Sequence, residues 1–109
     1  MHSLKKNKDF KRVYRKGNSY ASKNLVLYKL KNDLCYNRYG FSISKKIGKA
    51  VKRNKLKRRL REIIREIEKK EIKESYDIII IARNKVVELN FHQIRDDVIY
   101  LFKKMSLVD

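Results

Sequence analysis

Residues 39–70 read YGFSISKKIGKAVKRNKLKRRLREIIREIEKK, and the hydrophobic period of this stretch changes halfway along. Up to Ile43, apolar residues alternate with small polar ones, a period of two that is typical of a strand with one buried face. From Val51 onward, apolar residues recur every three or four positions, which is typical of a helix with one buried stripe. The stretch therefore predicts a strand over residues 39–45, followed by the longest helix of the chain over 51 to about 70.

The flanking sequence predicts the remaining elements of an α+β protein. A short helix is expected over 7–17 and a strand over 25–30. The nearly continuous apolar run YDIIIIA at 76–82 is typical of an interior strand. Asn90 and Gln93 resemble a capping box that opens a last helix. The order helix, two or three strands, helix, strand, helix predicts a two-layer sandwich, with helices packed over a mainly antiparallel sheet. The chain has no proline and no glycine-rich linker, so we expect one domain over 1–109.

The composition of the chain indicates a folded protein with a polyanionic partner. Its 109 residues include 30 Lys and Arg against 12 Asp and Glu, a net charge of +18 that opposes folding unless an anion relieves it. At 42% hydrophobic, the chain can still bury a core. No apolar run approaches the ~20 residues that a membrane span needs, and the single Cys35 fits a reducing compartment. We therefore expect a cytoplasmic protein with no membrane association and no obligatory protein partner.

Much of the positive charge lies between residues 45 and 61, where no acid appears before Glu62. Helix dipoles favour acids, not bases, at a helix N-terminus, so each misplaced cation costs about 0.3 kcal/mol or more. Since packing does not require this arrangement, we expect it to serve phosphate binding. A solvated charged face remains the alternative, and Asn54 could either cap the helix or hydrogen-bond a base or sugar.

The segment GFSISKKIGKAVKRNKLKRRLRE resembles the signature of the protein subunit of bacterial ribonuclease P. The flanks LKKNKDFKRVYRKG, LVLYKL and YDIIIIAR resemble the N-terminal helix, the following strand and a later strand of that family. One departure is Lys55, because the family has Arg-Asn-Arg where this chain has Arg53-Asn54-Lys55, and lysine lacks the bidentate fork of arginine. A second is the C-terminal segment 106–108, where some relatives carry an aromatic residue.

The resemblance implies a division of labour between an RNA and this chain. In this family the RNA subunit is the catalyst and hydrolyses precursor tRNA at the mature 5′ end with bound metal ions. The protein binds ribonuclease P RNA and the single-stranded 5′ leader. The chain would thus be a subunit of an endoribonuclease without catalytic residues of its own. It would bind no cofactor alone, and Mg²⁺ would be used by the RNA. The family fold is an α+β sandwich with a left-handed βαβ crossover.

The resemblance also assigns two sets of site residues. The first set matches the basic motif and is expected to contact RNA: Lys45, Lys46, Lys49, Arg53, Asn54, Lys55, Lys57, Arg58 and Arg61. The second set is expected to form the leader cleft, with aromatic rings that stack on unpaired bases and a small polar floor beside them: Phe10, Tyr14, Tyr28, Ser42 and Ser44. Ordinary helix–sheet packing is the alternative reading of Phe10 and Tyr14.

Three other functions compete with this interpretation. A structural RNA-binding protein, such as a ribosomal protein, would share the charge and size and would differ only in the specific motif. A DNA-binding protein with a helix in the major groove would need a preceding helix and turn, whereas strands flank the basic helix. A protein-only nuclease would need clustered carboxylates, and Asp9, Asp77, Asp96 and Asp97 show no convergent ligand spacing.

Overall fold

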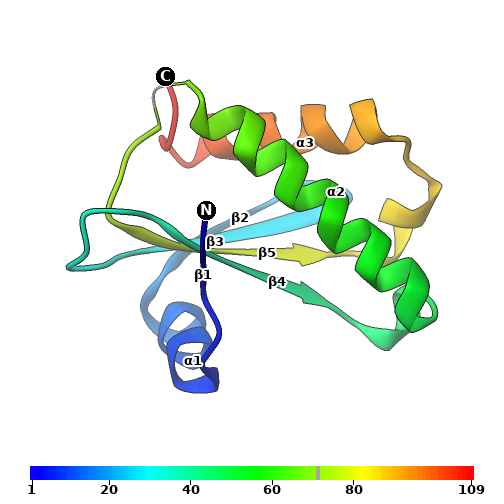
Figure 1. Cartoon of the computed structure of the whole chain (residues 1–109), viewed down its shortest axis with the longest axis horizontal. Coiled ribbons are helices and arrows are strands. Elements are labelled where there is room, and N and C mark those ends of the chain that lie inside the picture. Colours follow the sequence, from blue (N-terminus) through cyan, green and yellow to red (C-terminus); the bar gives the residue numbers. More distant parts are fainter. Residues whose placement is uncertain (71) are drawn as a thin grey trace.

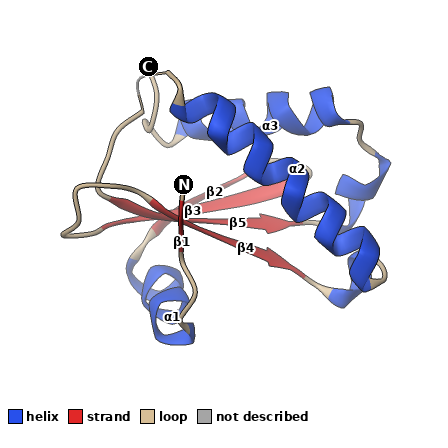
Figure 2. Ribbon diagram, viewed as in Figure 1, coloured by secondary structure: helices blue, strands red, loops and turns tan. Residues whose placement is uncertain are grey.

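A mixed sheet with helices on both faces forms the framework of the protein (Figure 1). The computed structural model describes residues 1–70 and 72–109. Figure 2 shows α1 on one face of the sheet and α2 with α3 on the other. In chain order the elements are β1 (His2–Ser3), α1 (Asn7–Lys16), β2 (Asn18–Ala21), β3 (Leu25–Lys31), β4 (Arg38–Ile43), the 3₁₀ helix η1 (Lys45–Ile47), α2 (Ala50–Glu68), β5 (Tyr76–Ala82), the 3₁₀ helix η2 (Asn84–Glu88) and α3 (Phe91–Lys104).

The α+β class predicted from the sequence is confirmed, and the sheet adds two features to it. In the described part of the chain, the strand order is β1-β4-β5-β3-β2. β4 runs parallel to both β1 and β5, whereas β3 is antiparallel to β5 and β2. The sheet is therefore mixed rather than mainly antiparallel. Because α1 lies on the opposite face from α2 and α3, the sandwich has three layers rather than two. The two-residue β1 is too short to produce a hydrophobic period.

The connection from β4 through α2 to β5 joins two parallel neighbours by a left-handed crossover. In Figure 1 the chain runs to the right along β4, back to the left along α2 above the sheet, and to the right again along β5, which lies behind β4. Such crossovers are almost always right-handed. The handedness implied by the resemblance is thus present. It places the N-terminal half of α2 beside the end of β4.

The main core lies between the sheet and the pair α2 and α3. α2 buries the stripe predicted for it, including Leu60 and Ile64, and α3 buries Val98 and Phe102. These side chains meet inward-facing strand residues such as Ile78. α3 begins with the predicted capping box, because Asn90 Oδ1 accepts from the backbone N–H of Gln93 while Gln93 Oε1 accepts from that of Asn90. No helix in the described residues is long and apolar enough to cross a bilayer.

The opposite face carries a smaller core under α1. Val13 packs there with Leu4 and Ile79, and Phe10 is half-buried beside them. Gly40 makes room for this ring, since a Cβ at that position would lie 2.5 Å from Phe10 Cζ. α1 begins at Asn7, with Lys6 rather than Asn7 at the N-cap, and ends before Gly17 as predicted. In Figure 1, α1 lies below the N-terminal end of β4 and not below its C-terminal end.

Candidate nucleic-acid interface

The basic run folds as a tight turn followed by the first turns of α2. Lys45 and Lys46 lie in η1, whereas the sequence predicted Lys45 as the last residue of the preceding strand. Ser44 caps η1 through its Oγ, which accepts from the backbone N–H of Lys46 at 3.2 Å. Gly48 then has a φ of 150°, a backbone conformation that favours glycine. Both lysines are exposed, and the turn leads directly to the exposed N-terminus of α2.

Five cations of α2 lie on one or the other side of its buried stripe. Lys57 and Arg61 face the edge of β4, where they line a hollow of about 180 Å³ with Phe10 and Gly40. We call this side the β4 flank. The other side faces η2 and α3, and we call it the α3 flank. A second cavity on this flank is lined by Lys52, Lys55 and Arg59. Asn54 and Arg58 are exposed on the outer face of the helix.

The cations of the basic run have no acidic partner within the part of the chain that the structure describes. The ion pairs found there, with N to O distances of at most 4.0 Å, belong to Arg12, Arg38 and Arg95. Arg53 is partly engaged in the fold, because its Nη1 donates to the carbonyl of Gly48 at 2.8 Å. The remaining charge is left to interact with an external anion.

Three aromatic rings predicted for the leader cleft lie together between α1 and β3. The ring centroids of Phe10 and Tyr14 are 6.3 Å apart, and those of Tyr14 and Tyr28 are 5.1 Å apart in an edge-to-face arrangement. Tyr14 is 38% exposed. Ser42 is half-buried on β4, two residues along from Gly40 and therefore on the same face. Ser44 differs, since it caps η1 outside the strand.

A buried charge network holds α1 against the sheet, and no spacing along the sequence predicted it. The carboxylate of Asp77 is fully buried on β5. It accepts from Arg38 at 2.8 and 2.7 Å, from Asn32 at 2.9 Å and from Arg12 on α1 at 3.1 Å. The signal for this network was one acid inside the apolar run YDIIIIA, which would not be tolerated there without partners.

The protonation of Asp77 follows from this network. Burial alone would raise the pKa of the Asp77 carboxyl, but hydrogen bonds from Arg38 and Asn32, the charge of Arg38 and the hydrogen bond from Arg12 outweigh burial. The pKa of Asp77 is therefore below its ordinary value. The same network raises the pKa of Arg38, chiefly through its hydrogen bond to Asp77. Both groups are charged at neutral pH, and the network helps to fix the position of α1 and its aromatic residues.

The other acidic and nucleophilic candidates serve local structure or lie apart. Asp97 Oδ2 accepts from Ser22 Oγ at 2.7 Å, which ties α3 to the loop after β2. Cys35 is exposed near the turn before β4. Among the residues described, no group of three or more His, Cys, Asp or Glu side chains is placed to hold a metal ion.

These features define a class of protein. It is a small α+β protein whose longest helix begins with a basic run that contains no acid, and an aromatic cluster lies near the strand edge that this helix faces. Such an arrangement suits a polyanion with unstacked bases.

Comparison with known proteins gives the family. The family model described as Ribonuclease P matches residues 1–106, and the chain belongs to this family. It is 42% identical to the ribonuclease P protein component of Alkaliphilus oremlandii over 109 residues, which is 100% of this chain and 95% of the relative. It is 45% identical to the protein component of Natranaerobius thermophilus, covering 97% of this chain and 91% of the relative.

Solved structures agree with this assignment. The fold is similar to that of the Staphylococcus aureus RNase P protein, with a TM-score of 0.91 and 37% identity over 100% of this chain and 99% of that one. It is also similar to the Thermotoga maritima RNase P protein, with a TM-score of 0.86 and 33% identity over 95% of this chain and 97% of that one. The recognition made from the central motif is confirmed.

Proposed function

We propose that this chain is the protein subunit of a cytoplasmic ribonuclease P holoenzyme. In this proposal it binds ribonuclease P RNA and the 5′ leader of precursor tRNA, and so assists endonucleolytic removal of the leader. Catalysis belongs to the RNA, which uses Mg²⁺, and the protein supplies binding and orientation. The chain contributes no catalytic side chain and needs no obligatory protein partner.

The unpaired charge of the basic run carries the RNA-binding part of this proposal. Ten Lys and Arg side chains lie between residues 45 and 61, and the described residues place no acid within ion-pairing distance of them. An RNA backbone that neutralises these cations releases condensed counterions, which is the main source of salt-dependent affinity. We expect Lys49, Lys57 and Arg58 to contribute through charge alone, because their side chains, unlike that of Arg53, make no hydrogen bond to the described residues.

The aromatic cluster supports the leader-binding part. Tyr14 and Tyr28 are partly exposed rings that can stack on bases of a single strand without selecting a sequence. The hollow beside Phe10 reaches Lys57 and Arg61 on the β4 flank. A strand lying over the aromatic rings would therefore have cations beside its phosphates. Ser42 is the polar floor residue of this cleft in the proposal, and Ser44 contributes through the turn that it caps.

A reconstitution experiment tests the proposal. Leader cleavage of a precursor tRNA is measured at low Mg²⁺ with a bacterial ribonuclease P RNA alone, with this protein alone, and with both. We expect stimulation only in the mixture. Cleavage by the protein alone would contradict the assignment of catalysis to the RNA. RNA binding without any stimulation would instead indicate a structural RNA-binding protein.

A further inference from the structure

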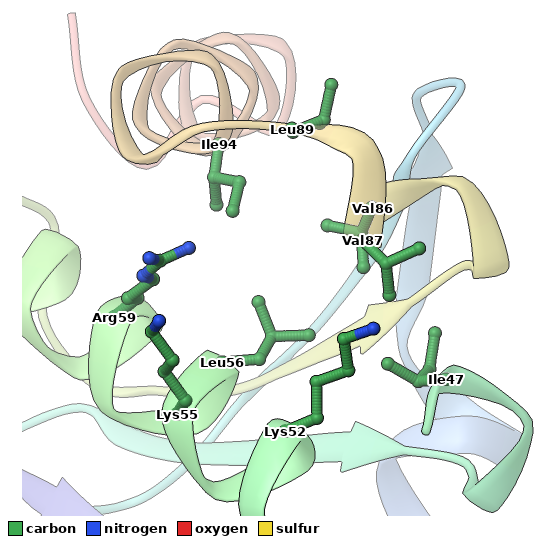
Figure 3. Close-up of a pocket in the computed structure, with 9 residues that line it drawn as sticks. All are labelled: Ile47, Lys52, Lys55, Leu56, Arg59, Val86, Val87, Leu89 and Ile94. Atoms are coloured by element: carbon green, nitrogen blue, oxygen red, sulfur yellow. The ribbon is translucent and has the colours of Figure 1, made fainter. Parts of the chain in front are cut away.

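The α3 flank of α2 borders a cavity that the proposed leader cleft does not use. This cavity has a volume of about 200 Å³ and lies between α2, η1, η2 and the start of α3 (Figure 3). It is on the other side of α2 from the β4 flank. Its floor is apolar and its rim is cationic. Core packing does not require the cations, and a simple phosphate contact does not require the apolar floor.

The floor of the cavity is formed by side chains of the main core. Leu56 rises from α2, Val86 comes from η2 and Ile94 from α3, and all three are buried. Figure 3 shows them around an open space between the three elements. A small apolar cavity holds water poorly, because water there lacks polar partners. An apolar group of a ligand would therefore be more stable in this space than water.

The rim is lined by the cations of the α3 flank. In Figure 3 the Lys52 side chain extends toward Val87, while Lys55 and Arg59 lie together on the opposite side of the opening. Gly48 allows this course for Lys52, since a Cβ at position 48 would lie 2.8 Å from Lys52 Cδ. The lining residues include no acid. The ion pairs within the described ranges do not involve these three cations either.

We propose that this cavity receives one unpaired nucleobase of an RNA, whose flanking phosphates contact Lys52, Lys55 and Arg59. Charge complementarity selects this occupant, because an anionic backbone matches the rim while the face of a base matches the apolar floor. Proteins hold extruded bases in such apolar pockets. The inference rests on the proposed function, in which the partner is ribonuclease P RNA, and adds a base-binding site on the second side of the helix.

The first test fills the cavity from its rim. Val87 is 44% exposed and lines the opening, so Val87→Phe can place a ring in the cavity without disturbing a fully buried position. The control is Val108→Phe, at a half-buried valine near the C-terminus that lines other hollows and not this cavity. We expect Val87→Phe to weaken binding of a bacterial ribonuclease P RNA about tenfold, the factor that corresponds to a small buried apolar contact. Val108→Phe should bind like the unsubstituted protein.

A second test separates the base from its phosphates. Methyl NMR spectra of the unsubstituted protein are recorded with a short oligouridylate and with an oligomer of equal length that lacks all of its bases. We expect the methyl signals of Leu56, Val86 and Ile94 to shift with the first oligomer and to stay in place with the abasic one. Equal shifts with both oligomers would overturn the base-binding inference and leave a phosphate contact only.

The outcomes distinguish this inference from the proposed function. If the unsubstituted protein stimulates the RNA and a folded Val87→Phe variant binds it equally well, the base-binding site is wrong and the proposed function stands. If the unsubstituted protein neither binds nor stimulates the RNA, the proposed function fails first. Methyl shifts caused by a short fatty acid but not by the oligouridylate would assign the cavity to a small amphiphile and overturn the inference.

Discussion

The two faces of the sheet differ in how completely their side chains are buried and in how polar they are. The face under α2 and α3 is a continuous apolar core in which residues such as Leu60 and Phe102 are fully buried. The face under α1 has a small apolar centre, a buried charge network around Asp77 and partly exposed aromatic rings. Apolar burial stabilises a fold without selecting a partner. The difference indicates that stability comes mainly from one face, while the other is left partly open to ligands.

Replacing one phenylalanine on each face tests this comparison most strongly. Phe102→Ala should lower the free energy of unfolding by about 3–5 kcal/mol, because it leaves a cavity in the main core. Phe10→Ala on the α1 face should cost roughly 1 kcal/mol, since that ring is only half-buried. Urea unfolding followed by circular dichroism measures both. Equal losses would mean that the two faces contribute similarly to stability.

The charge network gives the second-largest expected effect. Arg38→Ala should destabilise the protein by about 2 kcal/mol at neutral pH, less than for a fully buried pair, because Arg12 and Asn32 still reach Asp77. Arg38→Lys is the control that keeps a positive charge. The fold should tolerate both changes, with α1 less firmly held in the alanine variant. An unaltered unfolding free energy in Arg38→Ala would show that the network does not stabilise the α1 face.

The same network predicts how stability depends on pH. The pKa of Asp77 in the folded protein is below its value of 3.8 in the unfolded chain. The ionised carboxylate therefore contributes fully to the free energy of unfolding above the unfolded-chain pKa. This contribution is lost as the pH falls from about 4 through the folded-state pKa. Urea midpoints of unfolding, measured between pH 7 and pH 2, should therefore decrease as the pH drops below about 4. The fall should be smaller in Asp77→Asn, which has no carboxyl to titrate.

Removing charge from the basic helix should affect binding and leave stability almost unchanged. Lys57→Ala combined with Arg58→Ala should weaken binding to ribonuclease P RNA and reduce the slope of log affinity against log salt by about 1.5–2. The control, Lys69→Ala with Lys70→Ala, removes the same charge at the other end of α2. A salt titration compares them. If both pairs give the same slope, the effect comes from net charge and not from this surface.

The smallest expected effect concerns the aromatic cluster. Tyr14→Ala should weaken binding of a precursor tRNA by about 1 kcal/mol, the lower end of the range for one stacked base. Binding of the same tRNA without its leader should be unchanged. Tyr100→Ala, an exposed ring on α3, is the matched control. Equal weakening of both RNAs by Tyr14→Ala would indicate damage to the fold and not loss of stacking.

Sequence reasoning identified the elements that have a clear period. β5 was predicted with its observed bounds, and the stripe of α2 was correct because packing and pattern agree there. β1 was missed, since two residues carry no period, and the parallel pairing of β4 with β5 depends on a crossover that local pattern does not encode. The handedness came only from the family resemblance.

Some residues of the candidate site were predicted from the sequence and others were not. The aromatic residues Phe10, Tyr14 and Tyr28 were predicted to lie together, and they do. The Asp77 network was missed because its members come from α1, β3, β4 and β5 or the loops beside them, and no spacing along the chain connects them. Their roles in binding RNA stay predictions, which the variants above test.

The short first strand has a consequence for self-association. β1 pairs only with Arg38 and Tyr39, so β4 beyond Tyr39 has no neighbouring strand on that side within the described residues. An open strand edge can recruit the edge of another molecule and start aggregation. Here Lys57 and Arg61 lie beside the edge, and like charges on a second copy would repel them. The cations that we assign to RNA therefore also help to keep free copies of the protein apart.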